Sequence, residues 1–187
     1  PLPLPLPAQT ISQEANGPNR FALNDVDEGY TEPYAGWDYW QHKIDVLALR
    51  GINQVLVYQG QEKVYEQAFE TFGYTRDDLL RWIPQAAHQP WWLLQNLCCS
   101  AEPIAQSVID QRADLARKIA DRLRELGMTP VFPGFYGTVP PDFAKRNAGP
   151  HVVPTGEWDG YKRPDWLDPN DRWFAKVAAE FYRTQTA

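Results

Sequence analysis

The sequence contains two copies of one helix-to-strand junction, and this pattern restricts the fold more than any other feature. In one copy an amphipathic helix ends at Gly51 and an apolar strand covers 52–58; in the other a helix ends at Gly127 and the strand covers 128–132. A glycine that ends a helix directly before a buried strand is typical of parallel α/β folds. In (β/α) barrels the active site lies just after the strands, so the turns there are candidate site segments. These turns are rich in aromatic and polar residues, and cover 59–62 and 133–137.

Residue periodicity and turn residues predict the other elements. Phe21-Ala22-Leu23 is a short apolar run that predicts a first strand ending at Asn24. Thr75 with Asp78 three positions later has the form of a capping box and predicts the start of a short helix. Two segments, 88–102 and 133–167, have no clear period and predict long loops. Helices are expected over 37–50, 61–72, 75–82 and 103–126, and from residue 168 onward.

The order of these elements predicts an α/β fold that is part of a (β/α)8 TIM barrel. About the first three strand-helix units are present, with long loops at the carboxyl ends of the strands. Three parallel strands cannot close a barrel and would leave a strand edge uncovered, so we expect a fragment. Residues 1–16 are expected to be a Pro-rich arm or linker, and 17–187 the N-terminal portion of the barrel domain.

Composition narrows the classes of partner. The 187 residues carry a net charge of -6 with dispersed basic residues, which argues against nucleic acid as a partner. No run approaches the roughly 18 apolar residues of a membrane span, and the Pro-rich start is not a signal peptide. Cys98 and Cys99 are adjacent and the three histidines are scattered, so we expect neither a disulfide framework nor a metal site nor a cofactor. Eight tryptophans would suit stacking on sugars, although most are expected in the core.

Several side chains near the expected strand ends have two interpretations. Glu62 either faces the site or stabilises the N-terminus of the following helix, and Gln61 is an amide suited to a sugar hydroxyl. Phe135 and Tyr136 either line the pocket or belong to the core. For the acidic segment 25–28 a solvated loop is favoured over a catalytic pair or a calcium site. The pair Cys98-Cys99 is expected to be packed, without redox or nucleophilic chemistry.

Beyond these patterns, the chain resembles the barrel domain of the alpha-N-acetylglucosaminidases, family 89 of the glycoside hydrolases. The resemblance spans 21–187, and the order and spacing of its motifs agree together. The matching stretches are Trp37-Asp38-Tyr39-Trp40, Ile44-Asp45, Ala48-Leu49, Gly51-Ile52-Asn53, Gly60-Gln61-Glu62, Gln95-Asn96-Leu97, Gly127-Met128-Thr129-Pro130-Val131, Phe135, Gly137 and Val139-Pro140.

The resemblance implies a retaining exo-hydrolase that removes terminal alpha-linked N-acetylglucosamine from glycans. Such an enzyme needs two carboxyl groups about 5 Å apart. In the family the acid/base glutamate follows the next strand and the nucleophile lies further on, so the catalytic residues are expected beyond Ala187. The implied partners are the glycan and the remainder of the barrel, and the implied location is secreted or lysosomal. The alternative is a non-catalytic carbohydrate-binding or structural fragment with an aromatic sugar pocket.

The resemblance also implies roles for individual residues. Asn24 matches a sugar-hydroxyl ligand after the first strand, Trp91 matches a wall of the pocket, and Asn96 and Trp158 match further pocket residues. The sequence departs from the family pattern at Val26 and Cys98, where a family member has Cys and His, and it carries an extra stretch over 32–36. With the residues singled out above, the expected substrate-binding set is Asn24, Gln61, Glu62, Trp91, Asn96, Tyr136 and Trp158.

Overall fold

A computed structural model of the protein describes residues 8–98 and 102–187. Its central element is a three-stranded parallel sheet in the order β1 (Phe21–Ala22), β2 (Gln54–Leu56) and β3 (Thr129–Val131). Gln54 pairs with Phe21 on one side and Thr129 on the other, so all three strands are in line. The carboxyl ends of the strands therefore meet at one edge of the sheet, as the sequence predicts.

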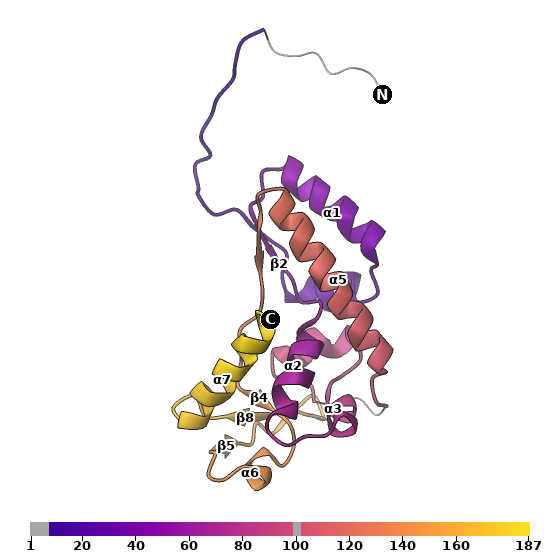
Figure 1. Ribbon diagram of the computed structural model, residues 1–187, viewed down its shortest axis with the longest axis vertical. Helices are drawn as coiled ribbons and strands as arrows, with labels where there is room; N and C mark the ends of the chain where they lie inside the picture. The colour runs from indigo at the N-terminus through magenta and orange to yellow at the C-terminus, as the bar shows by residue number, and fades with distance from the viewer. Residues whose placement is uncertain (1–7, 99–101) are drawn as a thin grey trace.

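Two helices cover one face of this sheet, α1 (Trp37–Leu49) and α5 (Gln106–Glu125) (Figure 1). The side chains between them form a core that includes Trp40 and Ile44 of α1, Val55 of β2, and Ile119 and Leu123 of α5. All of these are buried. This helix-covered parallel sheet is the wall of a (β/α) barrel, built from strands that alternate with outer helices.

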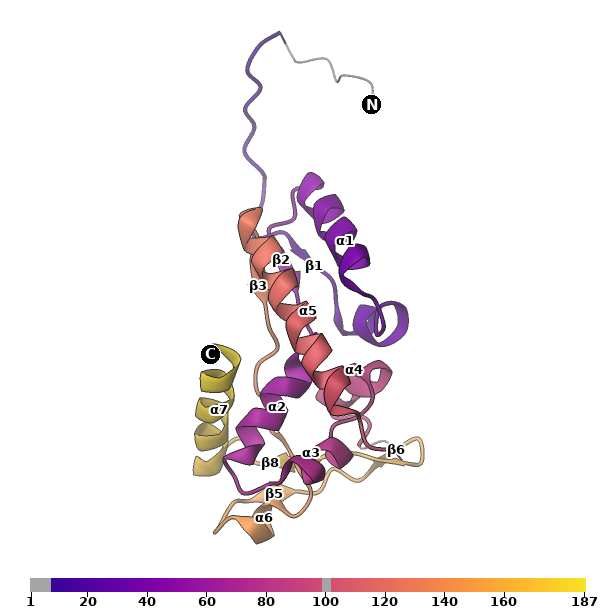
Figure 2. The same cartoon turned by 45° about the vertical axis from the view of Figure 1, so that its right-hand side comes forward.

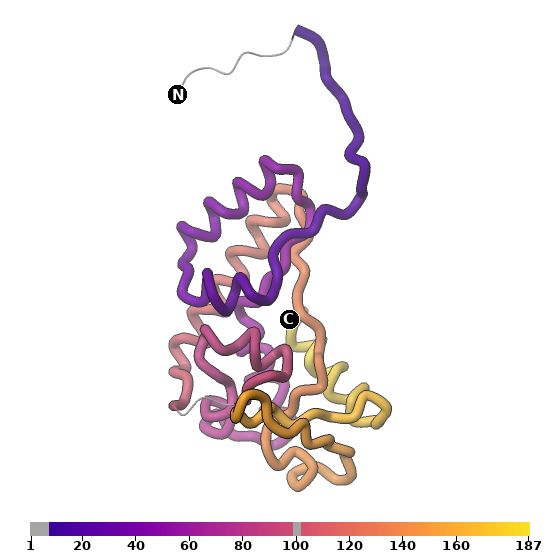
Figure 3. Tube along the Cα trace, turned by 180° about the vertical axis from the view of Figure 1, so that it is seen from behind, coloured from indigo at the N-terminus to yellow at the C-terminus, as the bar shows by residue number. Residues whose placement is uncertain are grey.

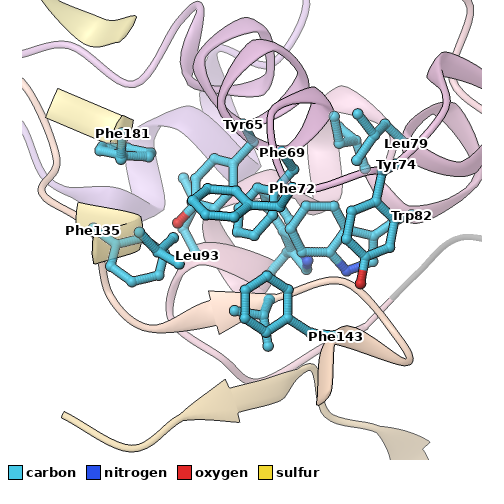
Figure 4. Packing of buried hydrophobic residues seen from close by; sticks show 14 of the residues in the cluster. Tyr65, Phe69, Phe72, Tyr74, Leu79, Trp82, Leu93, Phe135, Phe143 and Phe181 are labelled. Carbon is cyan, nitrogen blue, oxygen red and sulfur yellow. The ribbon is translucent and has the colours of Figure 1, made fainter. Parts of the chain in front are cut away.

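Beyond the carboxyl ends of the strands lie the helices α2 (Gln61–Glu70), α3 (Arg76–Trp82) and α7 (Arg172–Gln185) (Figure 2), and a second, aromatic core packs among them. Figure 4 shows its rings packed together, including Tyr65 and Phe69 of α2, Trp82 of α3 and Phe181 of α7. The centroid of the Tyr65 ring lies 5.1 Å from that of the Phe181 ring and 4.6 Å from that of the Trp92 ring. The elements around this core are α2 (Gln61–Glu70), α3 (Arg76–Trp82), η2 (Ala86–His88), α4 (Gln89–Leu93), β4 (Thr138–Val139), α6 (Phe143–Arg146), β5 (Val152–Val153), β8 (Asp165–Leu167) and α7 (Arg172–Gln185).

Several predicted elements are confirmed. The helices that end before Gly51 and Gly127 lead into β2 and β3, and both glycines have positive φ. Thr75 and Asp78 form the capping box that starts α3. Asp171 caps the last helix by accepting a hydrogen bond from the Trp173 amide. These signals are local, which explains why the sequence is sufficient to find them.

Other predictions about the loops are wrong. The segment 133–167 is not one loop, because β4, β8 and β5 form an antiparallel sheet and β6 (Glu157–Trp158) pairs with β7 (Tyr161–Lys162) as a hairpin. The segment after residue 88 contains the short helix α4. The long helix begins at Gln106, not at Pro103. Two-residue strands carry no periodicity, and a five-residue helix shows little more than one turn.

The N-terminal segment runs away from the folded body. Residues 8–16 are exposed and extended in Figure 3, and the first seven residues of the expected arm lie outside the described residues. The C-terminal end of α7 returns to the loop after β3, where the Gln185 side chain donates a hydrogen bond to the Pro133 carbonyl at 2.9 Å. Among the described residues no helix is long and apolar enough to cross a membrane.

Candidate functional site at the carboxyl ends of the strands

Polar groups from all three strand ends meet at this edge of the sheet. The Tyr58 hydroxyl, just after β2, donates a hydrogen bond to Asp25, just after β1. Tyr136, from the loop after β3, lies against the same hydroxyl. Burial, with further contributions from Asp25 and Tyr136, raises the pKa of Tyr58, so this hydroxyl stays a proton donor.

Asn24 lies at the exposed end of β1. Its side-chain oxygen accepts hydrogen bonds from the backbone amides of Val26 (2.8 Å) and Asp27 (3.3 Å). The backbone amide of Asn24 donates to the Asp27 carboxylate at 3.1 Å. These bonds hold the Asn24 side chain in one orientation. They leave its Nδ2 group, which has no partner among the described residues, as a donor for a ligand.

Gln61 and Glu62 are the first two residues of α2, and the start of this helix lies against α5. Gly60, at the N-cap, has φ of +83°, and a Cβ there would lie 2.9 Å from Ala116 of α5. Only glycine permits this close approach. Both side chains are buried: Gln61 is 2% exposed and accepts a hydrogen bond from Gln185 at 3.2 Å, while Glu62 is 1% exposed and pairs with Arg112.

A buried charge cluster lies directly behind these strand ends. Arg112 of α5 donates through Nε to Glu62 and through Nη2 to Glu28, which lies in the single turn η1 (Asp27–Thr31). It also donates to the Pro33 carbonyl at 2.8 Å and to the Gln89 side chain at 3.3 Å. One guanidinium thus joins the segments that follow β1 and β2 to α4.

The cluster contains two carboxylates for one guanidinium. Burial, opposed by Arg112, raises the pKa of Glu28 to about 7 and also raises that of Glu62. The two carboxylates in turn raise the pKa of Arg112 against its desolvation. Glu28 also receives a hydrogen bond from Gln59 and experiences the charge of Lys43. A raised carboxyl pKa marks many catalytic acids, but here burial causes it and only 3% of Glu28 is exposed.

An aromatic stack borders the site. The rings of Trp91 and Trp158 are stacked, with centroids 5.7 Å apart and an interplanar angle of 14°. Tyr30 contacts the Trp91 ring edge-on at 5.8 Å. Trp158 lies opposite Tyr161 in the β6–β7 hairpin and is 44% exposed. The pair joins α4 to the hairpin, from segments 67 positions apart, and leaves ring surface open to solvent.

Backbone contacts fix the loops that carry this stack. Gln95 donates a side-chain hydrogen bond to the Tyr136 carbonyl at 2.8 Å, and Arg163 donates to the Gln95 carbonyl at 2.8 Å. The Cys98 amide donates to the Lys162 carbonyl at 2.8 Å. Asn96 is half-buried in the same loop, and its amide donates to the Trp91 carbonyl at 2.8 Å. The loops after β2 and β3 are thereby joined into one wall.

The structure places the expected residues in three groups. Asn24 and Tyr136 lie at the strand ends, Trp91, Asn96 and Trp158 form or adjoin the aromatic wall, and Gln61 with Glu62 lie buried behind. Phe135 belongs to the aromatic core, whereas Tyr136 is 37% exposed. Cys98 packs partly buried against the aromatic core, and Cys99 lies outside the described residues. In the described part of the chain no group of three His, Cys, Asp or Glu side chains suits a metal ion.

The solvated loop expected for the acidic segment is wrong for Glu28. Its side chain is buried because Arg112 and Gln59 provide hydrogen bonds that replace water. Sequence reasoning also missed Arg112. The available signal is its position: it falls among Val108, Leu115 and Ile119, on the stripe of α5 that turns toward the protein. A charged residue there needs a buried counter-charge, which identifies it as a member of a cluster.

Comparison with known proteins places this arrangement in a family. Residues 20–187 match the family described as the alpha-N-acetylglucosaminidase (NAGLU) tim-barrel domain. The human alpha-N-acetylglucosaminidase is 29% identical over 188 residues, an alignment that covers 97% of this chain and 25% of that protein.

Solved structures agree with this match. The chain is similar to a family 89 glycoside hydrolase from Clostridium perfringens, solved with its substrate GlcNAc-alpha-1,4-galactose and with 2-acetamido-1,2-dideoxynojirmycin. In both cases the TM-score is 0.84 at 34% identity, over 90% of this chain and 20% of the other. The chain thus spans a quarter or less of these relatives. The sheet wall described above is a partial TIM barrel, and the chain belongs to the alpha-N-acetylglucosaminidase TIM-barrel family.

Proposed function

We propose that this chain forms the first three strand-helix units of the catalytic barrel of an exo-glycoside hydrolase. Its substrate is a glycan with terminal alpha-linked N-acetylglucosamine, and the remainder of the barrel is its partner. One observation carries the proposal: groups after β1, β2 and β3 converge at the edge where barrel enzymes bind substrate, in a chain of this family. Residues 17–187 are the barrel portion, and 1–16 an arm or linker.

The accessible groups at this edge suit a sugar. Asn24 offers an oriented amide donor, Tyr136 a partly exposed side chain, and the Trp91–Trp158 stack a flat apolar surface for a pyranose ring. Asn96 lies on the loop that holds the stack. Gln61 and Glu62 remain proposed site residues, and their burial favours a role behind the sugar over direct contact.

Hydrolysis requires two carboxyl groups that reach the glycosidic bond, about 5 Å apart if the enzyme retains configuration. Glu28 and Glu62 share Arg112 and are closed off from solvent, so neither can protonate a leaving group or attack an anomeric carbon. The proposed catalytic pair therefore belongs to the remainder of the barrel. This chain supplies binding surface, not reacting groups.

The test compares two proteins on an aryl alpha-N-acetylglucosaminide. The product of the complete reading frame that contains this chain is expected to hydrolyse it. Residues 1–187 alone are expected to show no hydrolysis above background, and to aggregate through their open strand edges. Glycan binding without hydrolysis by the complete product would favour the non-catalytic alternative. Turnover by residues 1–187 that disappears in Glu62→Gln would overturn the assignment of catalysis to the rest of the barrel.

A further inference from the structure

Arg112 is buried behind the site, yet it bonds to the segments that carry three proposed sugar ligands, Asn24, Gln61 and Trp91. We propose that Arg112 is a positioning residue for substrate, a clamp that fixes the η1, α2 and α4 segments relative to one another. The inference rests on the proposed function and deepens it, because it assigns the geometry of the sugar site to a side chain on the outer helix α5.

Two of the bonds from Arg112, those to Glu28 and Glu62, end beside proposed ligands. Glu28 lies one helical turn after Asn24, and Glu62 is adjacent to Gln61. A small cavity of about 10 Å³, enough for about one water molecule, lies between Asn24, Glu28 and Tyr58. Glu28 and Asn24 therefore line the same small cavity.

A third bond, to Gln89, connects Arg112 to the helix that carries the aromatic wall. Gln89 accepts from Nη2 of Arg112 at 3.3 Å and lies two residues before Trp91 on α4. Tyr30, which contacts the Trp91 ring, belongs to the same turn as Glu28. Arg112 therefore holds both partners of the Tyr30–Trp91 contact. Nη1 completes the set by donating to the Pro33 carbonyl at the end of the same loop.

Only a guanidinium can make these bonds together. Its donors are held in one rigid plane, so fixing one carboxylate also fixes the other and the Gln89 amide. Lysine carries the same charge on a single freely rotating ammonium, and can neutralise Glu28 and Glu62 without fixing their relative positions. Arg112→Lys therefore separates the geometric role from the electrostatic one.

The experiment uses the product of the complete reading frame and three forms: wild type, Arg112→Lys, and Arg122→Lys as a matched control. Arg122 lies on the same helix, and its ion pairs with Asp45 and Glu125 are partly exposed. Arg112→Lys is expected to lower kcat/KM on an aryl alpha-N-acetylglucosaminide by about 10- to 100-fold, mainly in kcat. Arg122→Lys is expected to leave it unchanged.

Hydrogen exchange gives a readout independent of activity. In Arg112→Lys the amides of 26–32, 61–64 and 91–93 should exchange on the order of tenfold faster, whereas α3, held by its own capping box, should not change. If Arg112→Lys does not fold, Gln89→Met replaces it, because Met keeps the length of the side chain but removes the acceptor for Arg112 on α4; the same expectations then apply to the α4 amides and to kcat.

The outcomes distinguish a failure of the proposed hydrolase function from a failure of the role assigned to Arg112. An inactive wild type contradicts the proposed hydrolase, and the exchange pattern alone then decides whether the clamp exists. An active wild type with faster exchange but unchanged kcat shows that the clamp is structural only and overturns the positioning role. Unchanged exchange in all three segments overturns the clamp itself.

Discussion

The stability of this protein should fall as the pH rises from about 5 to about 8, because Glu28 must lose its proton in a buried site. The pKa of Glu28 is about 7 in the folded protein against an ordinary value of 4.5. Between these values the folded state keeps a proton that the unfolded state releases, so the free energy of unfolding decreases with pH. Stability is full below about 4.5, and the whole loss is reached above about 7.

The size of the effect follows from the difference between the two pKa values, which corresponds to about 3 kcal/mol. Glu62 contributes with the same sign, because burial raises its pKa too. In Glu28→Gln the amide keeps the shape and one acceptor for Arg112, and Arg112 still pairs with Glu62. The variant should therefore lose most of the pH dependence, and should be more stable than the wild type at pH 8.

Urea unfolding of the product of the complete reading frame, followed by tryptophan fluorescence at several pH values between 5 and 8, measures this directly. Glu180→Gln is the matched control, since its bonds with Arg183 lower the pKa of Glu180 and keep it ionised throughout this range. The control should retain the slope of the wild type. A wild type that gains stability from pH 5 to 8, or a Glu28→Gln variant with an unchanged slope, would refute the argument that burial governs Glu28.

Three further predictions test the aromatic wall of the site, the aromatic core and the cap of α3. In the product of the complete reading frame, Trp91→Ala or Trp158→Ala should lower kcat/KM on the order of tenfold to a thousandfold, about 1.4 to 4 kcal/mol; a large drop in melting temperature with unchanged activity of the folded fraction would place these rings in the core instead. Phe69→Ala should cost about 3 to 5 kcal/mol of unfolding free energy because the ring is fully buried, whereas Tyr161→Ala, at an exposed ring, should change it by less than about 0.5. Thr75→Ala removes half of the capping box of α3 and should cost about 1 kcal/mol in the same unfolding assay.

Sequence reasoning found the barrel wall because its signals are local. Glycine after a helix and a short apolar run before a polar turn define where β2 and β3 begin and end, and the family resemblance gives their order. The pairing of Trp91 with Trp158 is different: both were expected at the pocket, but no rule of spacing predicts that α4 and a hairpin stack their rings.

The features that were missed depend on contacts between distant segments. Periodicity shows that one face of α2 is buried, but it does not show that its partners are α3, α4 and α7 instead of the sheet. The same limit applies to Arg112, whose two carboxylates are 84 and 50 positions away. The apolar stripe predicts which face of α5 is buried, but it does not predict which residues pair with Arg112 on that face.

The partnership between α2 and α7 also sets an order for folding during synthesis. Tyr65 of α2 packs on Phe181 of α7, and Gln61 bonds to Gln185, so α2 leaves the ribosome roughly 100 residues before its partner. At about 5 to 20 residues per second this interval lasts roughly 5 to 20 s. The sheet wall can assemble once β3 has emerged, whereas the side of α2 that packs on α7 stays uncovered until α7 emerges. A nascent chain stopped before α7 should therefore carry a folded wall and an α2 whose Phe181-facing side is uncovered, the kind of apolar surface that chaperones bind.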